Sequence, residues 1–278
     1  MSTVERWCNE HKLYLSTEKT VGLMLKGKFD PERRPRIPIL GKIIKFHNEV
    51  KYLGIILSER LFFTSDVKYI AGKARMAINN MSSVARANWG VGYKELIKIY
   101  KGTFIPIITY ASPSWAKHLT KGQKGTLLAA QRTVAIRCFK GYRTTSLPAS
   151  LVIAGMVKIT DHIELTSIRY HHRKSMPCSI GPVEFHPQTP IKDKLKQLRT
   201  IQMQTWQEEW EHESRGRITF KYFPNLVNRL DAKWFVPDYY TSQLISGHGN
   251  IRSKLNQLRL ADSDLCDCGL SETVQHNI

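Results

Sequence analysis

Cysteines are few in this 278-residue chain, long apolar runs are missing, and acidic residues are outnumbered by basic ones. The five cysteines are odd in number and irregular in spacing, which argues against a disulfide framework and favours a reducing compartment. No stretch approaches the ~20 apolar residues of a membrane-spanning helix, so we expect no membrane partner. The N-terminal segment carries charges and no apolar core, which excludes a secretory signal there.

Several catalytic signatures are also missing. The chain has no Asp-Asp dipeptide, no phosphate-binding P-loop, no Gly-x-Ser-x-Gly and no His-Glu-x-x-His. Two-metal phosphoryl transfer needs clustered carboxylates, so this chain is not expected to polymerise nucleotides by itself. A nuclease-like carboxylate cluster would begin at Pro237-Asp238, but no acid-x-Lys pair follows closely.

Positive charge is what the chain has in excess. Lys and Arg number 42 against 23 Asp and Glu, for a net charge of +19. Residues 66–146 hold 14 of the basic residues and only two acids, Asp66 and Glu95. Such local concentration favours a face that binds a polyanion, and nucleic acid is the expected partner. The alternative is a generic basic protein.

Residue patterns predict an α+β fold that is mainly α. A hairpin is expected from strands at 43–46 and 50–57, after a short helix at 4–15, a strand at 21–25 and a loop at 26–42. Proline-rich residues 176–193 predict a domain boundary. Further helices are expected at 64–81, 93–104 (ended by Pro106), 122–140, 191–213 and 251–260.

The apolar stripes of these helices indicate an ordinary bundle core, so any binding function is expected on their basic faces. On the helix at 64–81, Lys68, Lys73 and Arg75 lie off the stripe. On the helix at 122–140, the basic residues off the stripe are Lys124, Arg132, Arg137 and Lys140. We predict that these faces contact nucleic acid.

Cys266-x-Cys268 followed by His276 is the sharpest local motif. Thiolates and imidazole are the usual zinc ligands, and a structural site needs four. The motif supplies three, and a fourth is expected beyond Ile278. The alternative is two unrelated cysteines near a histidine.

The order of several segments resembles reverse transcriptases of non-LTR (LINE-type) retrotransposons. Residues 7–25, WCNEHKLYLSTEKTVGLML, are similar to the segment that follows the catalytic loop in that family. Residues 50–57, VKYLGIIL, resemble the primer-grip hairpin, and residues 110–116, YASPSWA, resemble the end of the thumb. Residues 206–240 and the final CDCGLSETVQH resemble the C-terminal region of arthropod elements that insert into ribosomal RNA genes.

This resemblance implies a fold and a division into domains. Residues 1–63 would be the end of the polymerase palm with the primer-grip hairpin. Residues 64–175 would be a basic helical thumb, and residues 176–278 a mainly α nucleic-acid-binding region with a zinc-knuckle-like end. The chain would then be a fragment of a larger polyprotein that acts in the nucleus. RNA, DNA and the rest of the polyprotein would be its partners.

The resemblance also implies roles for single residues. Lys19 would lie near the incoming triphosphate, although a surface lysine is the plain alternative. Tyr52, Leu53 and Gly54 would position the primer end. Cys266, Cys268 and His276 would hold structural zinc, whereas Mg²⁺ would bind to acids outside this chain.

Two other functions stay open. A stand-alone nucleic-acid-binding protein from a degenerate element needs only the basic helices and aromatic residues. A C-terminal endonuclease would need a metal site that includes Asp238.

Overall fold

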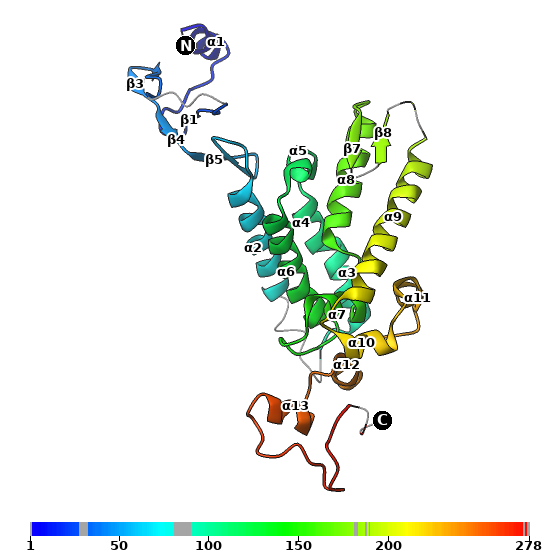
Figure 1. Cartoon of the computed structure of the whole chain (residues 1–278). Helices are drawn as coiled ribbons and strands as arrows, with labels where there is room; N and C mark the ends of the chain where they lie inside the picture. The colour runs from blue at the N-terminus through cyan, green and yellow to red at the C-terminus, as the bar shows by residue number, and fades with distance from the viewer. Residues whose placement is uncertain are drawn as a thin grey trace. The chain divides into compact units, whose positions relative to one another are not determined.

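The computed structural model describes residues 2–27, 33–80, 90–180, 183–186, 188, 190–274 and 276. In these parts the chain is mainly helical with small two-stranded sheets, which confirms the coarse α+β, mainly α prediction (Figure 1). Its contacts form two compact units, Met1–Tyr69 and Ile70–Ile278, which divide within helix α2 (Thr64–Asn80). None of the described helices is both long and apolar enough to cross a bilayer. The division at 63/64 and 175/176 stays a prediction.

In its described residues the first unit consists of helix α1 (Ser2–Glu10), short strands and the start of α2. Strand β1 (Val21–Leu23) pairs in parallel with strand β4 (Lys45–His47), and Gly22 lies opposite Phe46. A Cβ on Gly22 would lie 2.7 Å from the Phe46 ring, so this close approach requires glycine. The elements are α1 (Ser2–Glu10), β1 (Val21–Leu23), β2 (Pro38–Ile39), β3 (Lys42–Ile43), β4 (Lys45–His47), β5 (Glu49–Tyr52) and β6 (Ile55–Ser58).

The predicted hairpin between 43–46 and 50–57 is wrong in its pairing. The hairpin is formed by β5 and β6, with Tyr52 opposite Ile55. Leu53 and Gly54 are its turn, with φ of 47° and 86°. Positive φ at both central residues matches the twist of the two strands, so the chain reverses here. The Asp66 carboxylate accepts a hydrogen bond from the Ile56 backbone N–H at 2.8 Å and links the hairpin to α2.

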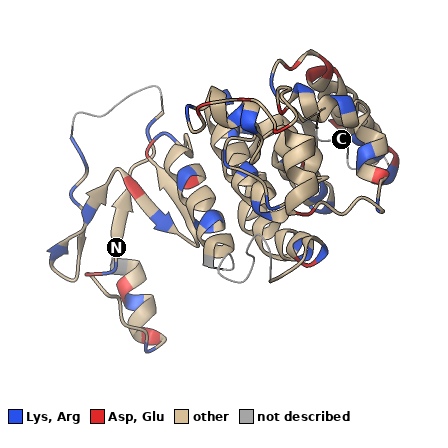
Figure 2. Ribbon diagram, turned by 90° about the horizontal axis from the view of Figure 1, so that it is seen from below, with Lys and Arg blue, Asp and Glu red and all other residues tan. Residues whose placement is uncertain are grey.

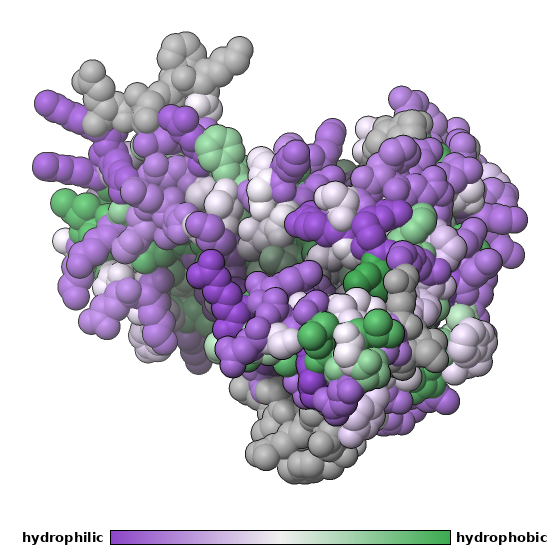
Figure 3. Space-filling model, turned by 60° about the horizontal axis from the view of Figure 1, so that its bottom comes forward, coloured by the Kyte–Doolittle hydropathy of each residue, from purple (hydrophilic) through white to green (hydrophobic). Residues whose placement is uncertain are grey.

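The second unit is a helical bundle in which α8 packs against α4, α5, α6 and α9, and α7 against α6, α10, α11 and α12 (Figure 1). In the face that Figure 3 shows, hydrophilic residues predominate and apolar ones form small separate areas. After α2 the helices are α3 (Tyr93–Ile99), α4 (Ile105–Thr109), α5 (Ser112–Trp115), α6 (Lys121–Cys138), α7 (Leu147–Ile153), α8 (Ile159–Arg173), α9 (Ile191–His212), α10 (Arg217–Tyr222), α11 (Leu226–Asp231), α12 (Tyr239–Ser246) and α13 (Arg252–Gln257).

Contrary to the prediction, Pro106 does not end the helix that begins at Tyr93. Between α3 and α4 the chain forms a π-helical segment, Tyr100–Phe104, in which the Ile105 N–H bonds to the Tyr100 carbonyl. Pro106 then lies in the first turn of α4, where its missing N–H costs little. Met81, the last residue of the helix predicted at 64–81, lies outside the described residues.

A buried glutamine joins three elements of the bundle. Gln131 on α6 donates from Nε2 to the Tyr100 hydroxyl at 2.8 Å and to the Val157 carbonyl at 2.7 Å. Its Oε1 accepts from the backbone N–H of Ile159, at the start of α8, at 2.9 Å. A fully buried amide is thereby satisfied, and it caps a helix that has no side-chain cap of its own.

The proline-rich stretch contains structure of its own. Strands β7 (Cys178–Ile180) and β8 (Val183–Phe185) pair antiparallel. They contribute Val183 and Phe185 to a buried cluster with residues of α8 and α9. The second unit therefore continues through this stretch.

Candidate nucleic-acid interface and cysteine cluster

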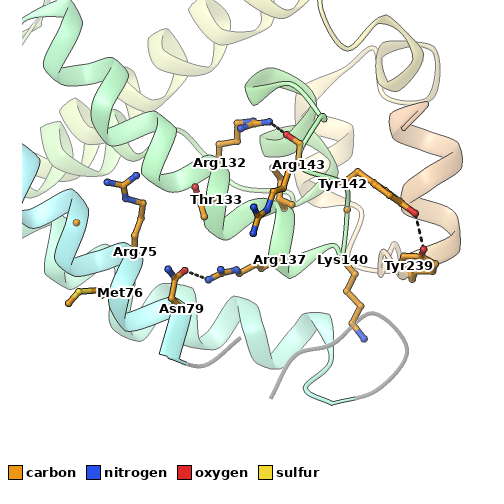
Figure 4. A pocket seen from close by; sticks show the side chains of 13 residues that line it. Arg75, Met76, Asn79, Arg132, Thr133, Arg137, Lys140, Tyr142, Arg143 and Tyr239 are labelled. Carbon is orange, nitrogen blue, oxygen red and sulfur yellow. Dashed lines mark hydrogen bonds between the residues drawn. The ribbon is translucent and has the colours of Figure 1, made fainter. Parts of the chain in front are cut away.

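A cavity of about 920 Å³ opens in the second unit between α2, α6, the loop that follows α6 and the start of α12 (Figure 4). None of its described lining residues is acidic. Two tyrosines, Tyr142 and Tyr239, lie at one end. We call this cavity the cationic groove, and its positively charged residues are Arg75, Arg132, Arg137, Lys140 and Arg143.

The way α6 ends places the basic loop at the groove. Thr120 and Gln123 form a capping box that begins the helix. At the other end Lys140 has a φ of 55°, and the Gly141 N–H bonds back to the Ile136 carbonyl at 2.9 Å. This bonding pattern closes a Schellman motif, which turns the chain sharply after the last helical residue.

The groove's positive side chains divide into anchored and unanchored groups. Arg132 Nε donates to the Thr145 carbonyl at 2.8 Å, and its guanidinium also bonds to the Arg143 carbonyl, so it holds the loop in place. Arg137 donates to the Asn79 side chain. Arg75, Lys140 and Arg143 make no side-chain hydrogen bond or ion pair within the part of the chain that the structure describes. The unanchored group can therefore reach a ligand.

Electrostatics make the groove suited to an anion. Partial burial, and secondly the charge of Arg143, lower the pKa of Arg137 from its ordinary value. The like charges thus raise each other's energy in a site whose described lining offers no carboxylate. A phosphate between them would relieve this repulsion and form charge-assisted hydrogen bonds. Figure 2 shows Lys and Arg along the helices of the bundle.

Tyr142 and Tyr239 face each other at one end of the groove. Their hydroxyls lie 3.0 Å apart and their ring centroids 6.3 Å apart (Figure 4). Tyr239 is the first residue of α12, and its ring makes an edge contact with the exposed Tyr240. Aromatic surfaces therefore adjoin the positive charges.

Of the seven predicted basic residues, four line the groove: Arg75, Arg132, Arg137 and Lys140. Lys68 and Lys73 are exposed on α2 and do not line it. Lys124 lines a different hollow, where its Nζ lies 3.9 Å from Glu164 Oε1.

Sequence reasoning named the basic face of α6, with Lys140, but missed Tyr142, Arg143 and Tyr239. The run Lys140-Gly141-Tyr142-Arg143 carried a signal, because basic and aromatic residues alternate directly after a helix. Nothing near Tyr239 in the sequence pointed to α6.

The remaining predicted residues are placed elsewhere. Lys19 is exposed in a turn that is closed by a bond from the Thr20 N–H to the Ser16 carbonyl at 3.1 Å. Tyr52 and Leu53 are exposed at the hairpin turn. The Asp238 carboxylate caps α12 by accepting from the Thr241 N–H at 2.8 Å, which is a structural use of that acid.

Cys266, Cys268 and His276 lie together near the C-terminal end, with their ligand atoms within 4.8 Å of one another. Cys268 Sγ lies 3.2 Å from His276 Nε2. The Gly269 N–H bonds to the Cys266 carbonyl at 2.8 Å, and Gly269 has a φ of 84°, which favours glycine. The backbone N–H of Cys268, and secondly the His276 ring, lower the pKa of the Cys266 thiol, which favours the metal-binding thiolate.

Arg252 at the start of α13 holds the segment that carries these residues. It donates to the Leu265 carbonyl at 2.7 Å and pairs with Asp267 at 2.9 Å. No other group of three or more His, Cys, Asp or Glu with metal-binding spacing occurs in the described residues.

Known proteins place the chain among retroelements. It is 32% identical to the Retrovirus-related Pol polyprotein from type-1 retrotransposable element R1 4 of Nasonia vitripennis, over 95% of this chain and 72% of that protein. It is 27% identical to the Putative 115 kDa protein in type-1 retrotransposable element R1DM of Drosophila melanogaster, over 97% of this chain and 27% of that protein. It is also 27% identical to the R1 Pol polyprotein of Bradysia coprophila, again over 27% of that relative's length.

No family model and no solved structure matches the chain. The Nasonia protein is nevertheless similar over almost the whole chain and most of its own length. The chain belongs to the Pol polyproteins of R1-type non-LTR retrotransposable elements.

Proposed function

We propose that the chain is the part of an R1 reverse transcriptase that binds the template and primer, and that the catalytic carboxylates lie elsewhere in the polyprotein. The observation that carries this proposal is the cationic groove, whose described lining has five positive residues and no acid. Such a site binds the phosphate backbone without reading sequence, as a polymerase must. RNA, DNA and the rest of the polyprotein are its proposed partners, and the nucleus is the proposed place of action.

Salt dependence of binding tests the groove directly. The variant Arg75→Gln, Lys140→Gln, Arg143→Gln removes three charges that make no bond to described residues. Each lost phosphate contact should reduce the slope of log K against log[salt] by about 1, so we expect a total reduction of about 2–3. Fluorescence anisotropy with a labelled template–primer at several salt concentrations measures this slope.

A matched control removes the same charge elsewhere. Lys192, Lys196 and Arg199 are exposed on α9 and do not line the groove. The variant Lys192→Gln, Lys196→Gln, Arg199→Gln should keep nearly the whole salt slope. Equal reductions in both triple variants would show that only net charge matters and would refute the groove as the binding site.

Primer extension tests the location of catalysis. The chain has no Asp-Asp dipeptide, and its Asp238 caps a helix. We expect the chain alone to extend no primer with Mg²⁺ or Mn²⁺. Extension by the purified chain would refute the proposal that its catalytic acids lie outside.

We also propose that Cys266, Cys268 and His276 hold a structural zinc ion. Two thiolates and one imidazole are a zinc-type donor set, and the lowered pKa of Cys266 supports it. A fourth ligand from outside this group would complete the tetrahedron. Bound zinc would fix the segment that follows α13.

A further inference from the structure

We propose that the cationic groove receives an unpaired strand of DNA or RNA, with a base stacked on the Tyr142–Tyr239 pair and the adjoining phosphates bound by Arg75, Lys140 and Arg143. This inference rests on the proposed nucleic-acid-binding function and names the form of nucleic acid that the groove takes. It follows from the two kinds of side chain that share one cavity.

Backbone binding alone accounts for the charges but not for the tyrosines. In a duplex the bases are paired and stacked on each other, so an aromatic ring beside the backbone has no base face to contact. In an unpaired strand the base faces are free, and sites for such strands combine a positive channel with aromatic rings. The groove has both features, and Tyr142 keeps 36% of its surface exposed.

Tyrosines at the groove are available for a ligand because α12 is held in place by another contact. The Ser242 hydroxyl, fully buried, donates to the carbonyl of Phe139 at 2.6 Å. This bond ties α12 to the end of α6 independently of the Tyr142–Tyr239 hydroxyl contact. A base can therefore displace or cover the tyrosine pair without releasing the helix.

Positive charges lie beside these rings at the same end of the groove. Arg143 directly follows Tyr142 in the chain, and Lys140 precedes it by two residues (Figure 4). The exposed Tyr240 ring, with its centroid 5.3 Å from that of Tyr239, offers a second surface for a neighbouring base. The spacing of charge and ring along a short loop fits the alternation of phosphate and base along a single strand.

An abasic oligonucleotide separates stacking from charge. The probes are a labelled single strand of about 12 nucleotides, the same strand with abasic sites throughout, and a duplex of that length. We expect the full chain to bind the normal strand about 5- to 100-fold more tightly than the abasic one, as one or more stacked bases would give. Anisotropy titrations at fixed salt give this ratio.

Two variants test whether the Tyr142 ring causes this difference in affinity between the normal and the abasic strand. Tyr142→Ala should abolish most of the preference for the normal strand over the abasic one, and it should weaken binding of the normal strand far more than binding of the duplex. Tyr142→Phe removes the hydroxyl contact but keeps the ring, so it should retain the preference. Tyr14→Ala, at a side chain that is 97% exposed in the first unit, is the control for loss of an unrelated tyrosine.

The outcomes separate this inference from the function on which it rests. Equal binding of normal and abasic strands, with a salt slope that the groove charge variant reduces, would overturn the inference and leave the proposed function intact. A salt slope unchanged in the charge variant would overturn both. Loss of the preference in Tyr142→Phe as well as in Tyr142→Ala would assign the hydroxyl contact a structural role and refute stacking.

Discussion

The helical bundle and the C-terminal segment 252–276 are ordered by different means. The bundle is filled with large side chains that have almost no exposed surface, among them Trp115, Phe104 and Leu127. In the described part of the segment only Val274 is buried, and polar bonds from Arg252 link its parts. Apolar burial therefore stabilises the bundle, whereas the segment depends on polar contacts and, as we propose, on zinc.

Removing a buried tryptophan from the bundle should have the largest effect. Trp210 on α9 is 1% exposed, packs on Phe220 and donates from Nε1 to the Phe223 carbonyl at 2.9 Å. Trp210→Ala should lower the free energy of unfolding by about 3–5 kcal/mol, because it leaves a cavity and an unpaired carbonyl. Chemical denaturation followed by circular dichroism measures this loss.

The counterpart in the segment is an exposed leucine. Leu260 is 72% exposed, so Leu260→Ala should change the free energy of unfolding by less than about 0.5 kcal/mol. If Leu260→Ala lowered the free energy of unfolding by several kcal/mol, the contrast between the bundle and the segment would be wrong, since the segment would then have an apolar core as well.

A buried carboxyl in the bundle should make its stability depend on pH. Burial, and secondly the charge of Glu164, raise the pKa of Asp161 from 3.8 to about 7, against the opposing charge of Lys158. The folded state thus holds a proton that the unfolded state loses near pH 4. The stability that this carboxyl contributes is fully present below that pH and is lost as pH rises toward 7.

Asp161→Asn keeps the shape of this side chain and removes its titration. At pH 8 the variant should be more stable than the wild type by about 1–3 kcal/mol, a range that allows for the favourable position of an acid near a helix N-terminus. Near pH 5 the gain should be much smaller. Denaturant titrations across this pH range measure the difference in free energy of unfolding between Asp161→Asn and the wild type. The prediction would be contradicted if the advantage of the variant were smaller at pH 8 than at pH 5.

The same contrast explains which elements could be predicted from the sequence. Helices α2, α6 and α9 were predicted because most of their buried residues are apolar and recur every three or four positions. Helix α8 was missed although it is central, because its buried face includes Thr160, Asp161 and Ser167. The start of α8 also depends on Gln131 of α6, whose Oε1 accepts from the Ile159 N–H, and periodicity cannot reveal such a distant partner.

The hairpin and the groove were only partly predictable for a related reason. A turn at Leu53 and Gly54 requires positive φ at a leucine, which residue preference argues against. The groove joins Arg75 on α2, the loop after α6 and Tyr239 on α12, and such contacts are set by packing rather than by local pattern. The Cys266-x-Cys268 spacing is local, so the cluster with His276 could be predicted.

Loss of the cysteine pair should have the smallest effect on the bundle. The full chain should bind about one zinc ion, and Cys266→Ser with Cys268→Ser should abolish this binding because two of the three ligands are lost. Cys178→Ser removes a half-buried thiol outside the cluster and should leave the zinc content unchanged. Elemental analysis of the purified chains gives the metal content.

Unfolding of the same variants shows whether zinc stabilises only the segment. Because the described contacts within 252–276 are mostly polar, the double serine variant should change the free energy of unfolding of the bundle by less than about 1 kcal/mol. Proteolysis within the segment should nevertheless become faster, since binding free energy at a structural site is also folding free energy. Absence of zinc both in the wild-type chain and in a version extended past Ile278 would refute the metal site. A loss of several kcal/mol from the bundle would instead show that the two regions fold as one, because metal ligation would then be coupled to the buried core.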